Sequence, residues 1–466
     1  MDKKWWILAS VACGTFMAAL DSSIVNIALP TLTQDLGTDL DRVKWIVVLY
    51  LLVITCLLLP FGRLSDQLGR KRVFEGGYWV FTAGSLLCAF VPSLHFLVAA
   101  RVLQAIGASM LMANGPAIIT AAFPADGRGG ALGVMSMVVS AGLISGPGIG
   151  GLLISYLGWR SIFLVNIPFG IAGIFLVQRF LDRDPKAERG IPFDWTGTLL
   201  QSAVLLMVIF LFDPPKLSFL SGAAEILRRM ESGLSRLLIG AVTLAMCLLF
   251  IRVESRAKAP LFDLSLMKIR TFWTSNLASF LTFVAFSTVS VLMPFYLEDA
   301  MHLPPHVAGA FMTAIPVTIL VIAPLSGRLS DRFGCRGLSV AGALVGALDL
   351  LTMAGEFGPG LTEDAGAHGV VLGLSAIGLA LGLFQSPNNN AIMGAVPISK
   401  IGVASALLAT IRNLGLVIGT GVAMEIFSWQ MTLSHGDFVH SLHFTHLLAA
   451  GVAVLAGIAA FGKKEA

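Results

Sequence analysis

The chain has 466 residues, of which 56% are hydrophobic and only 12% are charged. Soluble domains carry about 25% charged residues, so this composition excludes a soluble enzyme, a nucleic-acid-binding protein and a disordered scaffold. It predicts an all-α protein that crosses a membrane many times.

Fourteen stretches of the sequence are apolar enough for membrane spans, which need about 20 residues each. The predicted spans are residues 5–30, 45–61, 73–91, 94–121, 131–156, 161–180, 194–212, 234–251, 272–297, 306–325, 338–355, 368–393, 401–427 and 442–462. An even number of spans places both termini on one side of the membrane.

Lys and Arg residues give the expected orientation of these spans. With both termini inside, 22 of the 31 basic residues fall in inner segments and seven fall in outer segments. Positive residues are enriched in cytoplasmic loops, so we expect both termini in the cytoplasm. We expect a multi-pass protein of a bacterial inner membrane.

The sequence contains an internal repeat. The stretch GRLSDQLGR at 62–70 recurs 265 residues later as GRLSDRFGCR at 327–336, each time between the second and third spans of a half. Two six-span halves in parallel orientation explain the repeat, and two spans remain between them. The predicted domains are 1–190, the N-terminal half; 191–255, an inserted helix pair; and 256–466, the C-terminal half.

Two glycine-containing motifs support helix packing. In the loop after the second span, Gly62 and Gly69 allow a tight turn, Asp66 can cap a helix end, and Arg70 belongs to a basic cluster. Asp331 is the equivalent acid in the second copy. The fifth span carries a stripe of small residues that lets another helix approach closely. The stripe and its flanking residues are Gly142, Gly146, Pro147, Gly150 and Gly151.

These motifs resemble those of the major facilitator superfamily. The loop is similar to its motif A, a latch between conformational states, and the stripe is similar to motif C of drug-exporting members. LDSSIVNIALP at 20–30 resembles the first-span motif of fourteen-span drug:proton antiporters, and RVLQAIG at 101–107 resembles motif B, with Ala105 in place of a typical glycine. The resemblance covers the whole chain.

The resemblance implies the major facilitator fold and a proton-coupled efflux antiporter. Such a protein exports lipophilic, often cationic small molecules by alternating access and acts as a monomer in the lipid bilayer. The proton gradient supplies the energy, so we expect no cofactor, no metal and no nucleic acid. An exporter or flippase of a native lipid or metabolite would use the same motifs. A membrane enzyme would need a catalytic or metal constellation, and the inner side carries no HExxH motif or histidine box. A channel or receptor would leave the repeat unexplained.

Ionisable residues deep in the spans are the candidates for proton coupling, because charge at that depth is costly. Asp21 lies about 13 Å below the outer end of the first span, and Arg101 lies about 12 Å deep in the fourth. Both spans border the central cavity in the facilitator fold, so we expect these two side chains to meet. Separation of the pair would let Asp21 take up a proton. A static buried ion pair is the alternative.

Further polar residues within the spans are candidates for the substrate cavity. They are Asn26, Gln104, Arg412, Asn388 and Asn389. Gln104 shares a helix face with Arg101, whereas the asparagines at 388 and 389 could equally serve interhelical hydrogen bonding. Glu425, near the outer end of the thirteenth span, is a further candidate for proton coupling or a wet residue of an outer gate.

Overall fold

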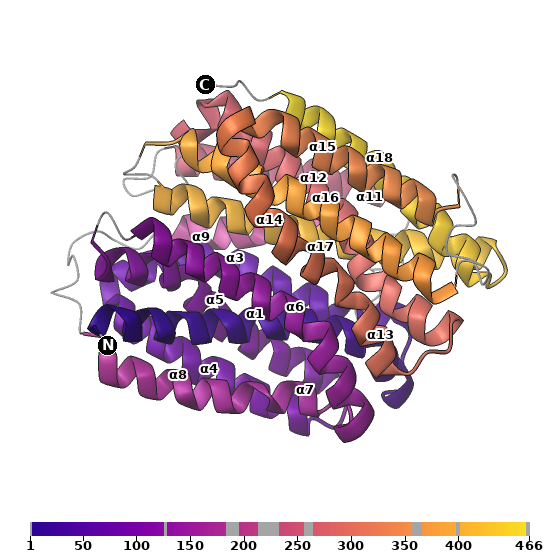
Figure 1. Ribbon diagram of the computed structural model, residues 1–466, viewed down its shortest axis with the longest axis horizontal. Coiled ribbons are helices and arrows are strands. Elements are labelled where there is room, and N and C mark those ends of the chain that lie inside the picture. The colour runs from indigo at the N-terminus through magenta and orange to yellow at the C-terminus, as the bar shows by residue number, and fades with distance from the viewer. Residues whose placement is uncertain are drawn as a thin grey trace.

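The computed structural model describes residues 2–124, 128–182, 195–212, 233–255, 264–355, 366–397 and 401–462. They form long helices aligned with the long axis of the molecule (Figure 1). A segment in lipid has no water to bond its backbone polar groups, and an α-helix satisfies all of them internally. Long apolar segments therefore become helices here.

The N-terminal half occupies one side of the molecule (Figure 1). Its helices are α1 (Lys3–Asp35), α2 (Leu40–Val43), α3 (Trp45–Leu68), α4 (Arg70–Phe90), α5 (Leu94–Ala122), α6 (Arg128–Leu157), α7 (Ser161–Leu164) and α8 (Asn166–Phe180). At about 1.5 Å per residue, the 33 residues of α1 extend well beyond the roughly 30 Å hydrocarbon core.

The C-terminal half lies beside it. Its elements are the short helix η1 (Leu264–Lys268), α12 (Arg270–Phe295), the π-helical turn η2 (Tyr296–Ala300), α13 (Pro305–Met312), α14 (Ala314–Phe333), α15 (Cys335–Met353), α16 (Gly366–Gly394), α17 (Ile401–Leu433) and α18 (Phe438–Phe461). Helices α1 and α12 contact each other, as do α3 and α17, so the halves form one bundle.

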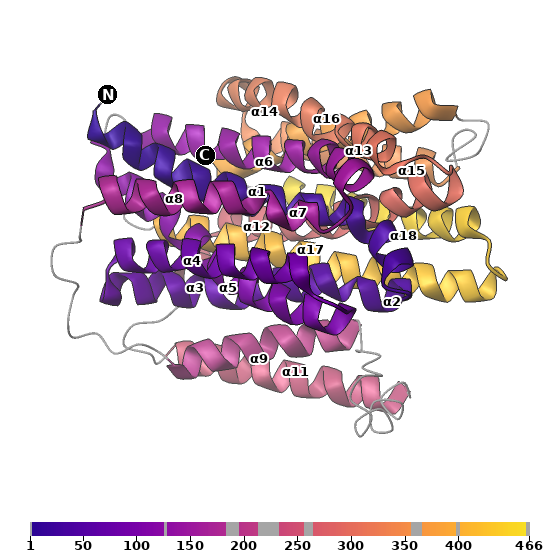
Figure 2. The same cartoon turned by 90° about the horizontal axis from the view of Figure 1, so that it is seen from below.

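The helices α9 (Trp195–Phe212) and α11 (Gly233–Glu254) lie together along one side of the bundle (Figure 2). Helix α9 contacts both α3 and α17, and so covers a seam between the halves. The boundaries predicted around residues 190 and 255 border or fall within 183–194 and 256–263, which are outside the described residues.

Each of the fourteen predicted spans coincides with one helix or with two in direct succession. Among the described residues, eleven helical segments are long and apolar enough to cross a membrane. Helices α6 and α9 contain shorter apolar stretches, Ala141–Leu157 and Thr196–Val208. The protein is therefore a multi-pass membrane protein with an all-helical fold, and the count of fourteen stays a prediction.

The repeated loop has the same geometry in both halves. Helix α3 ends before Gly69, whose φ is 96°, and α14 ends before Gly334, whose φ is 83°. Both values lie in a region that side-chain-bearing residues avoid. The hydroxyls of Ser65 and Ser330 each donate to the carbonyl three residues earlier, at 2.6 and 2.7 Å. The sequence repeat is thus a structural repeat.

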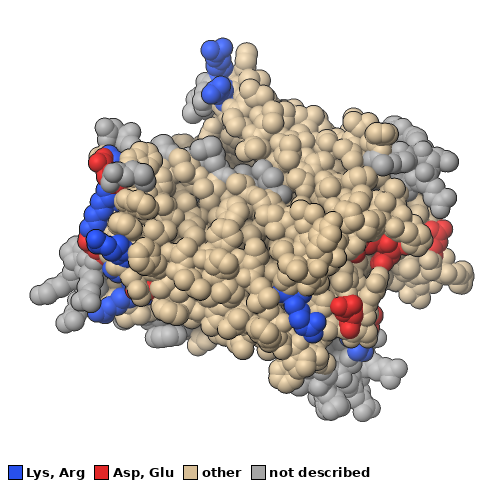
Figure 3. All heavy atoms as spheres, turned by 60° about the horizontal axis from the view of Figure 1, so that its bottom comes forward, with Lys and Arg blue, Asp and Glu red and all other residues tan. Residues whose placement is uncertain are grey.

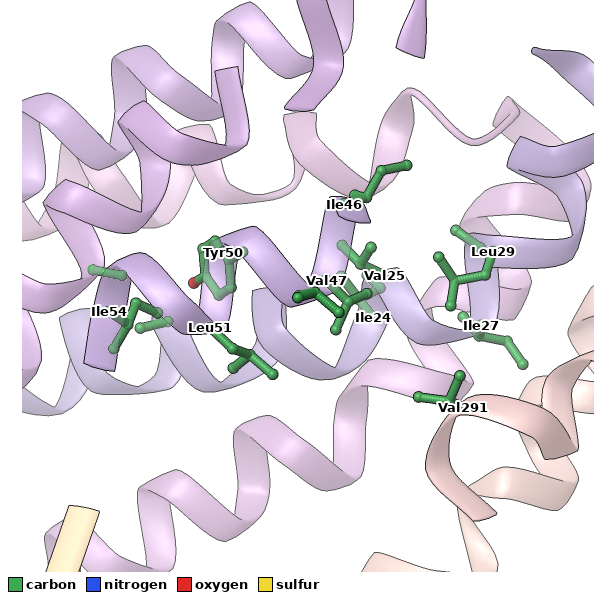
Figure 4. Close-up of a cluster of buried hydrophobic side chains, with 14 of the residues drawn as sticks. Ile24, Val25, Ile27, Leu29, Ile46, Val47, Tyr50, Leu51, Ile54 and Val291 are labelled. Carbon is green, nitrogen blue, oxygen red and sulfur yellow. The ribbon is translucent and has the colours of Figure 1, made fainter. Parts of the chain in front are cut away.

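Apolar side chains from both halves meet in one buried cluster. Figure 4 shows Ile24 of α1 near Val47 of α3, and Ile27 of α1 near Val291 of α12 from the other half. Tyr50 lies in the same cluster. Close packing of this kind is what holds helices together in lipid, where apolar burial alone gives little preference.

On the face drawn in Figure 3, Lys and Arg gather at the left end and Asp and Glu lie toward the right, with a broad belt between them that carries few charges. The end that carries Lys3, Lys71 and Arg179 is called the inner end below, following the orientation expected from the sequence. Such a belt fits the apolar layer of a membrane.

Candidate functional site

A buried ion pair lies inside the N-terminal half. The Nη1 atom of Arg101, on α5, is 2.5 Å from Oδ2 of Asp21, on α1. The side chains are 1% and 0% exposed. The proximity expected from their matching depths is confirmed. Charge-assisted hydrogen bonds of this kind are about twice as strong as neutral ones.

Neutral polar groups complete a network around Asp21. Gln104 Nε2 donates to Asp21 Oδ1 at 2.8 Å, and Asn166 Nδ2 donates to the same oxygen at 2.9 Å. Gln104 Nε2 also lies 2.7 Å from the hydroxyl oxygen of Ser85 on α4. Helices α5 and α8 therefore hold the carboxylate of α1 directly, and α4 supports them through Ser85, as a charge removed from water requires.

Aromatic rings cover the guanidinium of Arg101. Its central carbon lies 3.7 Å from the ring centre of Tyr50 on α3, and 5.8 Å from that of Phe163 on α7. Cation–π contacts strengthen when water is excluded. Since the charges of Asp21 and Arg101 cancel, the N-terminal half presents an internally neutral polar core.

Ser85, Tyr50 and Asn166 join this network although none of them was a sequence-based candidate. Asn166 begins α8, directly after the break that separates α7 from α8. Its signal was available, because it is the one amide in the predicted sixth span that lies two residues before a proline, Pro168. Ser85 and Tyr50 carried no comparable signal, since single hydroxyls occur in many membrane helices.

Asn26 does not join the Asp21 network. Its Nδ2 donates across the interface to the hydroxyl of Ser290 on α12, at 3.0 Å. The angular offset of five helical residues from Asp21 turns it toward the other half. Asn26 is therefore a contact between halves in this state.

Arg412 lies near the middle of α17 and faces α12. Its guanidinium carbon is 6.0 Å from the ring centre of Phe283. The Phe283 and Phe286 rings are 6.5 Å apart in an edge-to-face arrangement. Among the described residues, no hydrogen bond or ion pair joins Arg412 to another side chain. This is the opposite arrangement to that of Arg101.

The remaining candidates occupy other places. Glu425 is half-buried and lies eight residues before the end of α17, because this helix continues to Leu433 rather than ending near 427. Asn388 is buried and donates to the Ser275 carbonyl at 3.1 Å, so it joins α16 to α12. Asn389 is exposed near the inner end of α16.

In the motif A loop, one glycine makes the turn. Gly69 provides the positive φ between α3 and α4, and Arg70 Nη1 donates to the Ala117 carbonyl of α5 at 3.3 Å. Gly62 instead lies within α3, and a Cβ added there meets no atom within 4 Å. The expectation that Gly62 shapes the turn is wrong. The side chains of Asp66 and Asp331 are outside the described residues.

The glycine stripe of α6 packs directly on α1. A Cβ added to Gly142 would lie 2.9 Å from the Phe16 carbonyl oxygen, and one added to Gly146 would lie 2.9 Å from the Ile24 nitrogen. At Gly150 the added atom would lie 2.7 Å from Ile24 Cγ1. The close approach expected of the stripe is confirmed. Gly415 and Gly419 make the equivalent contact between α17 and α12.

A second, neighbouring face of α6 contacts the other half. A Cβ at Gly151 would lie 2.9 Å from His306 Cα, and one at Gly309 would lie 3.0 Å from the Pro147 carbonyl carbon. Motif C thus has two packing surfaces, one for α1 and one for α13.

Several hydrogen bonds close the outer end between the halves. Ser155 contacts His306 Nδ1 at 3.2 Å, Gln34 Nε2 donates to Asp299 at 3.4 Å, and Ser428 donates to Asp41 at 3.0 Å. Together with the glycine contacts of α6, they hold the outer ends of the two halves against each other.

Comparison with known proteins gives a consistent result. The family model for the Major Facilitator Superfamily matches residues 11–420. Riboflavin transporter RibZ of Clostridioides difficile is 36% identical over 93% of this chain and 90% of its own length. Multidrug efflux pump LfrA of Mycolicibacterium smegmatis is 30% identical over 91% of this chain and 81% of its own length. A crystal structure of a D-xylose-proton symporter has a TM-score of 0.67 at 15% identity, covering 98% of this chain and 97% of that one.

Proposed function

Because the chain belongs to the Major Facilitator Superfamily, and is a transporter rather than an enzyme, we propose that it is a proton-coupled exporter of lipophilic small molecules. One observation carries the proton coupling: Asp21 is the carboxylate held by Arg101, Gln104 and Asn166 inside the N-terminal half. A protein that needed only packing there could use apolar residues at no loss of stability.

The proton step follows from the geometry of this pair. While Arg101 neutralises it, Asp21 stays ionised and holds no proton. A shift of α5 against α1 that separates the two charges leaves a carboxylate in a dry, apolar site, where it takes up a proton. Return of Arg101 then expels that proton. Conformational change and proton binding are thereby coupled through one contact.

Alternating access requires the outer and inner ends to open in turn. The contacts at Gly151, Gly309 and Asn26 close the outer end here, which fits an inward-open or occluded state. The turns at Gly69 and Gly334 sit at the inner end, where they can support the motif A latch as the halves rock.

The fine topology belongs to the same proposal. We propose fourteen spans, both termini in the cytoplasm and a bacterial inner membrane as the location. The charge sorting of the sequence and the belt of few charges in Figure 3 support this. We also propose that the chain works as a monomer, with α9 and α11 as the inserted pair.

Two classes of substrate are candidates. Export of drugs is favoured by similarity to LfrA, whose name describes a multidrug efflux pump. Transport of a native metabolite is favoured by similarity to RibZ, a riboflavin transporter, over most of both chains.

Proteoliposomes with an imposed pH gradient test the proposal. Riboflavin and ethidium represent the two classes, and accumulation against a concentration gradient is measured for wild type and Asp21→Asn. The matched control is Asp182→Asn, because Asp182 forms an exposed ion pair with Lys3 at 2.5 Å. We expect proton-driven accumulation in wild type and control, and only downhill movement in Asp21→Asn. Full gradient-driven transport by Asp21→Asn contradicts the proposal.

A further inference from the structure

We infer that Arg412, with Phe283 and Phe286, forms a substrate subsite for planar aromatic molecules that carry hydrogen-bond acceptors such as ring carbonyls. This subsite selects neutral or anionic compounds over lipophilic cations. The inference rests on the proposed transport function and specifies its substrate class.

Arg412 has no hydrogen-bond or ion-pair partner among the described residues. A guanidinium has five N–H donors, and Arg101 uses its own on Asp21 and Gln104. Arg412 makes no such bond within the described residues. It is half-buried near the middle of its helix. An arginine at this depth faces a water-filled cavity or the bundle interior rather than lipid, so its donors remain available to a ligand.

Two aromatic rings of α12 lie beside these donors. Phe283 is buried, with its ring centre 6.0 Å from the Arg412 guanidinium carbon, and the half-buried ring of Phe286 packs edge to face against it. A planar ring system can stack on the accessible part of Phe286, while its carbonyl oxygens accept from the arginine fork. The combination recognises both the plane of a ligand and the acceptors on its edge.

The charge of Arg412 is not neutralised by an ion pair among the described residues. Asp21 and Arg101 cancel each other within 2.5 Å. Asp349, on α15, points toward α16, where its Oδ1 lies 3.8 Å from the position of a Cβ on Gly373. The guanidinium of Arg412 therefore gives its surroundings a positive potential. A like charge nearby in a partly buried site is repelled, so a cationic ligand is disfavoured.

The pattern of small residues keeps Arg412 in this place. Gly415 and Gly419 lie on the same side of α17 and bring it against α12. A Cβ at Gly415 would lie 3.1 Å from Phe283 Cβ. The close helix contact fixes the distance between the guanidinium and the ring.

Equilibrium binding to the full-length protein in detergent tests the inference. Riboflavin, which is planar, neutral and rich in carbonyls, and ethidium, which is a planar cation, are titrated by fluorescence. Wild type is expected to bind riboflavin at least about tenfold more tightly than ethidium. Arg412→Gln is expected to lose about tenfold in riboflavin affinity and to gain ethidium affinity.

Two further variants separate charge, geometry and folding. Arg412→Lys keeps the positive charge but loses the planar guanidinium with its paired N–H donors. It should therefore still disfavour ethidium while binding riboflavin more weakly. Arg160→Gln is the matched control, because Arg160 is exposed at the outer surface with its guanidinium 4.3 Å from the Trp159 ring centre. It should bind both probes as wild type does.

The inference is overturned if wild type binds no riboflavin, if it prefers ethidium, or if Arg412→Gln keeps the wild-type affinities for both probes. Binding needs no pH gradient, so its outcome is independent of the transport experiment. Arg412-dependent riboflavin binding without proton-driven transport would reject the coupling mechanism and leave the subsite intact.

Discussion

The two halves share a helical scaffold but differ in how their arginine within the membrane spans is paired. In the N-terminal half, Arg101 is matched by Asp21 and covered by Tyr50. In the C-terminal half, Arg412 rests against Phe283 with no acid beside it among the described residues. The repeated backbone thus carries two different functions, which we assign as proton coupling in one half and substrate recognition in the other.

The shared scaffold shows what duplication preserved. Helix α6 packs on α1 through Gly142 and Gly146, and α17 packs on α12 through Gly415 and Gly419. A Cβ at these glycines would meet backbone atoms of the neighbouring helix, and no substitution on that helix can move those atoms out of the way. The polar side chains between the helices are free to differ, and they do.

Removal of each arginine gives the largest expected contrast. Arg101→Met leaves Asp21 buried and unpaired, which costs about 3–5 kcal/mol, so the thermal unfolding temperature in detergent should fall steeply. Arg412→Met removes a charge that has no partner within the described residues, and the unfolding temperature should stay level or rise.

The double variant Asp21→Asn/Arg101→Met controls for packing. It should regain most of the lost stability, because no unpaired charge remains in the N-terminal half. Equal destabilisation by Arg101→Met and Arg412→Met would remove the distinction between the halves.

A larger side chain at Gly151 should break the contact between the halves. The Cβ of Gly151→Val meets the backbone at His306, and overpacking costs about 1–3 kcal/mol. The fraction of molecules whose outer end is closed should fall about tenfold. Spin labels at Asp39 and Thr432, in a background without native cysteines, would report a longer distance across the outer end.

Gly451→Val is the control for that measurement, because a Cβ at Gly451 meets no atom within 4 Å. Its distance distribution should match that of wild type. An unchanged distribution in Gly151→Val would show that α6 and α13 do not limit outer closure.

Alanine at the repeated turns tests whether the halves are equivalent there. Gly69→Ala and Gly334→Ala each force a side chain into a φ near +90°, which costs about 1–3 kcal/mol, and both should lower the unfolding temperature by similar amounts. Gly62→Ala, within α3, should be neutral or stabilising. A large loss at Gly62 or a large difference between the two turns would contradict this reading.

Removal of the hydrogen bond between Asn26 and Ser290 is expected to have the smallest effect. Hydrogen bonds between membrane helices average about 0.6 kcal/mol. Asn26→Ala should therefore change the ratio of molecules with a closed outer end to molecules with an open one by less than about threefold. In a double-mutant cycle, Ser290→Ala should add nothing to Asn26→Ala. Additive shifts would mean that the two residues act separately.

Much of the fold follows from the sequence because lipid imposes simple rules. The apolar lengths located every long helix among the described residues, and the offset of GRLSD predicted the paired turns at Gly69 and Gly334. Helix ends were less accurate, since α17 continues to Leu433 where water-exposed residues extend the helix. The hydropathy of a span marks only its apolar part, so it does not predict how far the helix continues beyond the membrane.

The site was predictable only where charge marks it. Asp21 and Arg101 could be paired because two buried charges at equal depth have few other partners. Asn166, Ser85 and Tyr50 are neutral, and their contribution depends on side-chain directions that four converging helices set. The partial isolation of Arg412 was also invisible in the sequence, because it depends on what faces α17.

Proton release on substrate binding tests the division between the halves most directly. Riboflavin is added to weakly buffered protein in detergent with a pH indicator, for wild type, Asp21→Asn and Arg412→Gln. We predict proton release by wild type, normal binding without release by Asp21→Asn, and neither by Arg412→Gln at the same concentration. Undiminished proton release by Asp21→Asn would contradict the assignment of proton coupling to the N-terminal half.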